Sequence, residues 1–272
     1  GLNGEGKSTF IKMITGELTP DNGKIEWCKR ITTGYLDQYT SLTKGKTIRE
    51  VLREAFQHMY DLEAEMNELY NKMCDCTEEE MQGYLEDTGE IQSELESSGF
   101  YTLDSKIEEV ANGLGLGAIG LDHDVSNLSG GQRSKVLLTK LILAQPMILI
   151  LDEPTNFLDE DQIHWLEDYL SNYENAFLLV SHDVAFLNRV VNVIYHMDDG
   201  TLTRYTGNYD NYMQMYELKK RQQNMAYERQ QKEIKALETF IAKNKARVAT
   251  TDLAKIVQKI PHMYQFHQEE LL

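Results

Sequence analysis

Gly1-Leu-Asn-Gly-Glu-Gly-Lys-Ser-Thr9 opens the chain and decides its fold class. The pattern G-x-x-x-x-G-K-S predicts a loop between a β-strand and a helix, whose backbone N–H groups surround a di- or triphosphate. Lys7 is expected to reach the β- and γ-phosphates, and the Ser8 hydroxyl to ligate Mg²⁺. A glycine-rich turn before an ordinary helix is the alternative, which the complete motif disfavours. We therefore predict nucleotide-binding residues at Asn3, Gly4, Gly6, Lys7, Ser8 and Thr9.

A loop of this kind needs a buried strand in front of it, and no residue precedes Gly1. The sequence also lacks an initiator Met. We expect the chain to be a fragment that lacks at least this strand.

The bulk composition favours a folded protein without a membrane segment. The 272 residues are 41% hydrophobic and 26% charged, which is ordinary for a globular protein. The longest apolar run, 147–151, is far too short to cross a bilayer, and no signal peptide is visible. The three cysteines form no C-x-x-C pair, which favours a cytoplasmic location and argues against a cysteine metal site.

Charge is distributed unevenly along the chain. The net charge of −17 argues against a nucleic-acid partner for the chain as a whole. Residues 50–109 hold 18 acidic and 3 basic side chains, whereas residues 217–259 hold 5 acidic and 11 basic ones. Contacts with phosphate backbones are therefore expected from the second segment.

The first half of the chain predicts two short strands and then a helical region. Strands are expected around 24–27 and 31–36, and an apolar helical pattern begins at Thr47. A second helix opens at Thr77 with capping-box character, and a third covers about 103–110. This pattern predicts a helical subdomain over 49–126 with an acidic arm hairpin at about 57–100. A solvated bundle without a partner is the alternative.

Two further motifs carry chemistry. A helix begins at the segment Leu128-Ser-Gly-Gly-Gln-Arg133, and its first N–H groups can bind an anion. The same sequence pattern is also typical of an ordinary helix cap. The apolar run 147–151 predicts a strand buried on both faces of a parallel sheet, and Asp152 emerges at its carboxyl end. Asp152 is placed to hold Mg²⁺, and Glu153 to orient or deprotonate a water. A solvated turn is the alternative for these two carboxylates.

The last third of the chain predicts another buried strand, a hairpin and a long helix. Strand 176–180 leads to His182, which could sense a γ-phosphate, although a lone histidine at a strand end is more often structural. Residues 193–205 predict a β-hairpin. The chain then stays helical for some 35 residues, on the order of 50 Å. A helix break is expected at 250–252, and the tail 261–272 follows no pattern.

This set of motifs resembles the ATP-binding cassette ATPases over residues 1 to about 207. The family's motifs occur in order as Walker A (1–8), Q-loop Gln38, signature (128–132), Walker B Asp152-Glu153, D-loop Asp159 and switch His182. The resemblance implies an α/β P-loop NTPase cassette with a mostly parallel sheet, its core formed by 1–48 and 127–207. It implies ATP and Mg²⁺ as cofactors.

The resemblance also assigns roles to residues. Glu153 would be the catalytic carboxylate, assisted by His182 and Gln38, and Mg²⁺ would be held by Ser8, Gln38 and Asp152. Family ATP sites form between two cassettes arranged head to tail. Ser129, Gly130, Gly131, Gln132 and Asp159 would therefore serve a site shared with a second cassette, and one cassette alone should hydrolyse little ATP.

A narrower resemblance is to the ABC-F translation factors. It is carried by the segments 152–156 and 205–210, the acidic arm and the charged helix after the cassette. It implies a cytoplasmic tandem-cassette protein without a membrane partner. Such a protein binds the ribosome, and its interdomain linker, here 208–260, contacts rRNA and the P-site tRNA. Phe157 departs from the family, which usually has His there, and the segment from Pro261 does not continue the second linker helix.

Two other functions share these motifs. The chain could be the ATP-binding subunit of a membrane transporter, although such subunits rarely carry a charged helix of this length. It could also be a chromosome-maintenance ATPase, although the sustained heptads of those coiled-coil arms are missing.

Overall fold

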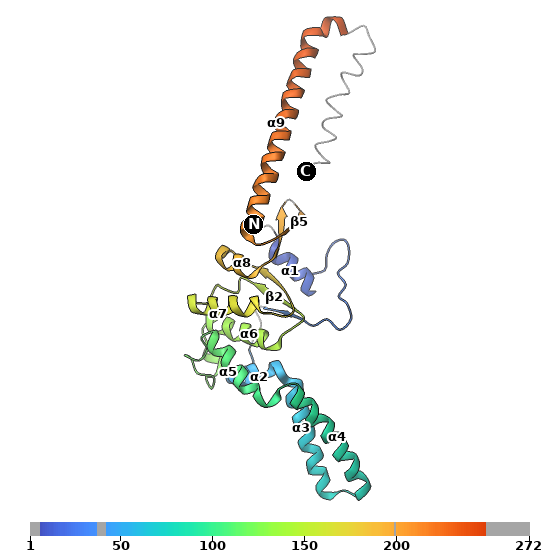
Figure 1. Ribbon diagram of the computed structural model, residues 1–272, viewed down its shortest axis with the longest axis vertical. Helices are drawn as coiled ribbons and strands as arrows, with labels where there is room; N and C mark the ends of the chain where they lie inside the picture. The colour runs from blue at the N-terminus through green and yellow to red at the C-terminus, as the bar shows by residue number, and fades with distance from the viewer. Residues whose placement is uncertain (1–5, 37–41, 199, 249–272) are drawn as a thin grey trace. The chain divides into compact units, whose positions relative to one another are not determined.

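The structure, a computed structural model, describes residues 6–36, 42–198 and 200–248. The chain divides into two compact units, residues 1–204 and residues 205–272. The first unit contains a small parallel sheet with helices around it and a two-helix hairpin, and the second contains one long helix (Figure 1). None of the helices that the structure describes has the length and apolarity needed to cross a bilayer.

A parallel sheet positions the motifs that follow its strands. It consists of β1 (Thr33–Tyr35), β2 (Ile148–Asp152) and β3 (Ala176–Val180), in the order β1-β2-β3. The register aligns Asp152 with Val180 on β3. As predicted, β2 is buried, and its residues 149–151 are fully shielded from solvent. Because parallel strands end at one edge of a sheet, Asp152 and the segments after β1 and β3 meet there.

Two strand predictions need correction. We expected β3 to be a buried strand, but Ala176 is exposed and the other four residues are only half-buried. In the described pairings β3 bonds to β2 on one side, so it forms an edge of this sheet. The strand expected around 24–27 is also wrong, because residues 24–28 are exposed and form no strand. The Trp27 Nε1–H donates to the carbonyl of Ile14 at 3.2 Å, so this segment is held by a side chain.

Four helices lie around the sheet. They are α1 (Lys7–Thr15), α6 (Gly130–Ala144), α7 (Glu160–Ser171) and α8 (Val184–Val190). The apolar faces of α6, α7 and α8 pack with β2 into one core, and α6 contributes more of it than α7 or α8. The fully shielded members of this core include Val136, Leu138, Ile142, Leu149, Leu151, Leu166 and Phe186.

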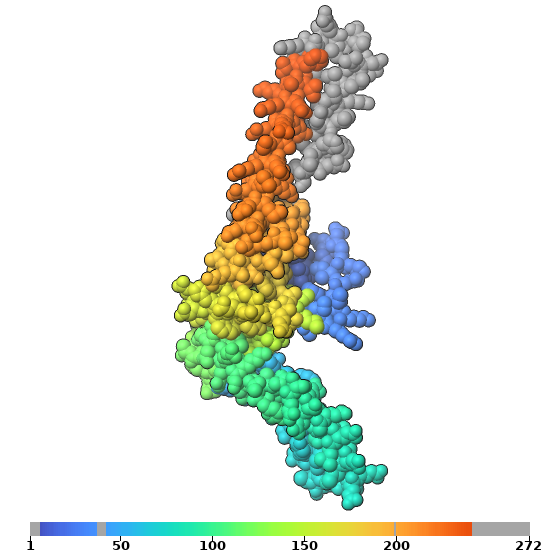
Figure 2. Space-filling model, viewed as in Figure 1, coloured from blue at the N-terminus to red at the C-terminus, as the bar shows by residue number. Residues whose placement is uncertain are grey.

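The acidic arm is a hairpin of two helices, as predicted. Helix α2 (Ile48–Arg53) and the short turn η1 (Glu54–Phe56) lead into α3 (Gln57–Lys72), and η2 (Met73–Asp75) connects it to α4 (Glu78–Ser97). Helices α3 and α4 lie side by side (Figure 1), and most of their side chains are exposed on the face in view (Figure 2). The arm returns through η3 (Phe100–Thr102) to α5 (Leu103–Gly113), and η4 (Val125–Asn127) precedes α6.

Capping boxes begin α2, α4, α6 and α7. At α4 the Thr77 side chain accepts a hydrogen bond from the Glu80 amide, and the Glu80 side chain accepts one from Thr77 N–H, as the sequence predicts. Each such box satisfies two helix-end donors that would otherwise have no partner in the helix.

The end of the described chain consists of a hairpin and the long helix. The strands β4 (Val193–Asp198) and β5 (Thr201–Thr206) form the predicted hairpin. Helix α9 (Tyr209–Val248) has 40 residues and a length of about 60 Å at 1.5 Å per residue. The predicted break at 250–252 and the tail 261–272 lie outside the described residues.

Candidate functional site

The first helix begins in a way that suits an anion. Gly6 precedes α1 with φ +89°, a left-handed conformation that glycine adopts without strain. Its carbonyl accepts the first helical bond, from Phe10 N–H at 2.8 Å. The N–H groups of Ser8 and Thr9 belong to the first turn, where the helix itself offers no acceptor, and such N–H groups can bind a phosphate. The predicted residues Asn3 and Gly4 lie outside the described residues.

The structure brings Ser8 and Asp152 together. Ser8 Oγ donates a hydrogen bond to Asp152 Oδ2 at 3.2 Å, although the two residues are 144 positions apart in the chain. A hydroxyl and a carboxylate at this distance are a suitable pair of protein ligands for Mg²⁺, which takes its remaining ligands from phosphates and water. The start of α1 and the end of β2 therefore fit a Mg²⁺-bound nucleotide.

Glu153 is held in a strained turn directly after β2. Its φ of +48° is a left-handed conformation that costs a non-glycine residue on the order of 1–3 kcal/mol. Its N–H donates to the carbonyl of Val180 on β3 at 2.8 Å, which fixes the turn to the sheet. Strain of this kind persists where the surrounding structure over-determines it, often at functional sites.

The Glu153 carboxylate is partly engaged by His182. Its Oε2 accepts a hydrogen bond from the backbone N–H of His182 at 3.2 Å. Its Oε1 is buried and has no hydrogen-bond partner among the described residues. His182 Nε2 lies 3.3 Å from this oxygen, a contact that becomes an ion pair when the imidazole is protonated. The two predicted catalytic residues are therefore adjacent, and one carboxylate oxygen has no hydrogen bond to a described residue.

Gln38, the third predicted catalytic residue, lies outside the described residues. Two residues before it, Leu36 is buried, and its N–H donates to the carbonyl of Ile150 on β2 at 3.2 Å. The backbone of Leu36 is thus tied to the strand that carries Asp152.

The signature residues cap their helix. Ser129 Oγ accepts from Gln132 N–H at 3.3 Å, and Gln132 Oε1 accepts from Ser129 N–H at 2.9 Å. A side chain added at Gly130 would meet open space, so a ligand could approach the backbone there. That these residues serve a second cassette stays a prediction.

Asp159 is also a helix cap. Its Oδ1 accepts from Gln162 N–H at 3.0 Å, and its Oδ2 accepts from the Gln162 side-chain amide. Lys135 Nζ of α6 donates to Gln162 Oε1 at 2.6 Å. Sequence reasoning missed Lys135, because nothing in the local pattern indicates a partner 27 residues away.

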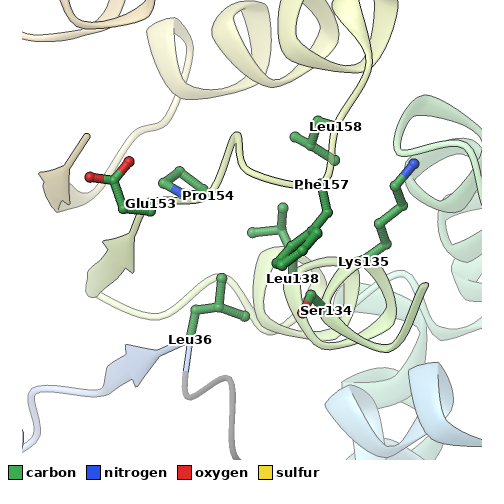
Figure 3. A pocket seen from close by; sticks show the side chains of 8 residues that line it. All are labelled: Leu36, Ser134, Lys135, Leu138, Glu153, Pro154, Phe157 and Leu158. Carbon is green, nitrogen blue, oxygen red and sulfur yellow. The ribbon is translucent and has the colours of Figure 1, made fainter. Parts of the chain in front are cut away.

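A hollow lies beside the chain segment between Glu153 and Asp159, which joins β2 to α7 (Figure 3). It is bordered by helix α6, by the chain after β2 and by Leu36. The ring of Phe157 lies against α6, and the Glu153 carboxylate is at the far end of the segment (Figure 3). Phe157 was singled out in the sequence by its departure from the family pattern, although its contact was not foreseen. The lining residues are Leu36, Ser134, Lys135, Leu138, Glu153, Pro154, Phe157 and Leu158.

The parallel sheet, the anion-binding start of α1 and the Ser8–Asp152 pair define a P-loop nucleotide-binding protein. A family model described as "ABC transporter" matches residues 1–156, and a second with the same description matches residues 195–261. The chain belongs to the ABC family of ATPases. Cassettes of this family bind ATP together with Mg²⁺ and hydrolyse it.

Curated relatives extend beyond the length of this chain. The ABC transporter ATP-binding protein YfmM of Bacillus subtilis is 56% identical over 259 residues, which are 95% of this chain and 50% of YfmM. The energy-dependent translational throttle protein EttA of Mycobacterium tuberculosis is 36% identical over 215 residues, 79% of this chain and 38% of EttA. The ABC transporter F family member 2 of Arabidopsis thaliana is 30% identical over 275 residues, 100% of this chain and 40% of that protein. The chain thus spans half or less of the length of each of these relatives.

A solved structure shows the same fold. The ATP-binding subunit of an ABC transporter superposes with a TM-score of 0.55 at 22% sequence identity, covering 80% of this chain and 80% of that one.

Proposed function

We propose that this chain is the ATP-binding cassette and part of the linker of an ABC-F ATPase that acts on the ribosome. The Ser8–Asp152 contact at 3.2 Å supports ATP binding most directly, because it joins the start of α1 to the end of β2. Bound Mg²⁺ would supply positive charge to the β- and γ-phosphates. Lys7 and the amides of the first turn of α1 would orient the same phosphates.

In this proposal Glu153 is the general base for hydrolysis. Its Oε1 is buried, has no hydrogen bond to another described residue and lies 3.3 Å from His182 Nε2; in this proposal it is the oxygen that accepts the proton from water. The His182 N–H holds the second carboxylate oxygen at 3.2 Å and so limits its rotation. The left-handed turn and its bond to Val180 fix the base relative to Asp152. His182 would thus position the carboxylate and approach the γ-phosphate, with Gln38 at the metal and water.

The active site would be completed by a second cassette of the same protein. The open space above Gly130 at the start of α6 suits the approach of a nucleotide held by another cassette. The chain alone is then expected to bind ATP and to turn it over slowly.

A ribosomal partner is supported by charge and by relatives. Residues 217–259 hold 5 acidic and 11 basic side chains, and the lysines and arginines of 217–240 are exposed to solvent. Such a helix can neutralise phosphates of rRNA and of a P-site tRNA. The name of EttA describes a translational throttle, and another relative is named as an F family member. A cytoplasmic location follows from a ribosomal role.

The test is nucleotide-dependent cosedimentation with ribosomes. Glu153→Gln in the full-length protein should trap the ATP-bound complex, because the amide cannot accept the proton from water. Asp152→Asn should prevent trapping by weakening Mg²⁺ binding. Glu153→Gln that pellets no more than wild type in the presence of ATP would refute the ribosomal role.

A role as the ATP-binding subunit of a membrane transporter is the second candidate, and the name of the relative YfmM, an ABC transporter ATP-binding protein, favours it. This role predicts copurification with a membrane partner from detergent-solubilised membranes. Ribosome cosedimentation that is independent of nucleotide, together with such copurification, would favour the transporter role.

A further inference from the structure

We propose that Phe157 and Lys135 are positioning residues that couple the signature helix α6 to the catalytic turn of the same cassette. The segment from Glu153 to Asp159 runs directly from the proposed base to the cap of α7. It touches α6 at two independent points, one apolar and one polar.

Phe157 makes the apolar contact. A Cβ atom at Gly131 would lie 3.2 Å from Phe157 Cδ1 and 3.6 Å from its Cβ and Cγ, so the ring lies against the backbone of the second signature glycine. The same ring borders the hollow that Ser134 and Leu138 of α6 also line (Figure 3). The aromatic ring therefore ties the first turn of α6 to the middle of the segment.

Lys135 makes the polar contact. Its ammonium donates to Gln162 Oε1 at 2.6 Å, and the Gln162 side chain also donates to Asp159 at the end of the segment. Gln162 is buried, and a Cβ atom at Gly115 would overlap its amide, so this amide has little room to move. The polar contact is thus fixed in place at the end of the segment nearest α7.

The segment that joins Glu153 to these contacts is short and internally hydrogen-bonded. Asn156 N–H donates to the carbonyl of Glu153 at 3.3 Å, and Leu158 N–H donates to that of Thr155 at 3.1 Å. A shift of the first turn of α6 would therefore move the Glu153 turn through the Phe157 ring. The consequence for hydrolysis rests on the proposed function. When a second cassette binds at the signature residues, the first turn of α6 would shift and change the position of the Glu153 carboxylate in this cassette.

Amide hydrogen exchange of Asn156 and Leu158 in the nucleotide-free chain tests the coupling. Ser129→Ala removes the cap of α6 without altering the segment, and it should raise exchange of both amides about threefold to fivefold. In a Phe157→Ala background the same substitution should have less than about half of this effect. Phe157→Tyr, which keeps the ring, should restore it, and a Lys135→Met background should reduce it.

Thr77→Ala is the matched control, because it removes an equivalent capping box on the arm helix α4. It should leave both amides unchanged. The proposal is overturned if Ser129→Ala leaves these amides unchanged in the wild-type chain, or if its effect is undiminished with Phe157→Ala. Should Phe157→Ala fail to fold, Phe157→Leu takes its place. Because no nucleotide is present, the result is independent of whether the chain hydrolyses ATP.

Discussion

Glu54 joins two parts of the first unit, so its replacement by Gln has a predictable effect on stability. Its Oε1 lies 2.6 Å from Lys46 Nζ, and its Oε2 lies 2.5 Å from Lys140 Nζ on α6. The Glu54 side chain is 26% exposed, whereas those of Lys46 and Lys140 are 42% and 34% exposed. Glu54 thus connects the start of the helical region to the signature helix with one carboxylate.

The expected loss is moderate, because solvent screens the two lysines. Glu54→Gln keeps the shape and one acceptor oxygen but removes the charge from both contacts. We expect the free energy of unfolding at pH 7 to fall by about 1 kcal/mol, within the range of partly exposed charge pairs. For a unit of this size, such a loss lowers the thermal midpoint by about 2–4 °C.

The pH dependence has a definite sign. Burial raises the pKa of Glu54, but the hydrogen bonds and charges of Lys140 and Lys46 outweigh it, so the folded-state pKa lies below the ordinary value of 4.5. A depressed carboxyl pKa stabilises the fold above the unfolded-state pKa, and this contribution is lost as the pH falls through the folded-state pKa. The difference between wild type and Glu54→Gln should be complete at pH 7 and should shrink below about pH 4.5.

Thermal and urea unfolding followed by circular dichroism at pH 7, 4.5 and 3.5 measures this difference. Glu26→Gln is the control, because Glu26 pairs with Lys24 at 2.6 Å while both side chains are more than two-thirds exposed. The control should match wild type at every pH. The reasoning is refuted if Glu54→Gln equals the control at pH 7, or if its deficit is undiminished at pH 3.5.

Other substitutions test the arm, the core and the long helix. Gly83→Ala, inside α4 with open space around it, should raise the free energy of unfolding of the arm by about 0.5–1 kcal/mol in local hydrogen-exchange measurements. In Gly113→Ala the new Cβ atom would overlap the Trp165 ring, so this substitution should destabilise the first unit by about 1–3 kcal/mol in urea unfolding. Equal urea midpoints for Gly83→Ala and Gly113→Ala would contradict the packing. Replacing Lys219 and Lys220 by Gln should reduce the slope of log affinity against log salt for structured RNA by about 1.5–2, measured by fluorescence anisotropy. An unchanged slope would remove these two lysines from the RNA contact.

Local signals predicted several elements correctly because each carries its own physical cause. The buried strand β2 is a continuous apolar run between two prolines, and the capping box at Thr77 begins α4 where the sequence places it. The strand expected around 24–27 failed, because forming a strand requires a pairing partner elsewhere, and no such pairing is present in the described residues. The burial of β3 was overestimated for the same reason, since burial depends on neighbours rather than on the strand's own apolar residues.

Only those features of the candidate site that belong to recognisable sequence motifs could be predicted from the sequence. The pairing of Ser8 with Asp152 follows from the P-loop pattern and a strand ending in a carboxylate, even across 144 positions. The left-handed backbone of Glu153 and the Lys135–Gln162 bond had no sequence signal. Both depend on how α6, α7 and β3 pack around the segment, and that packing is a property of the whole fold.

Calorimetric titration of the chain with ATP, with and without Mg²⁺, tests most directly whether the first turn of α1 and the end of β2 form one Mg²⁺–triphosphate site. We predict Mg²⁺-dependent binding that Asp152→Asn weakens at least tenfold and that Glu153→Gln preserves, because Asp152, and not Glu153, would hold the metal together with Ser8. Binding that is absent, or that is equally tight with Asp152→Asn in the presence of Mg²⁺, would contradict this site.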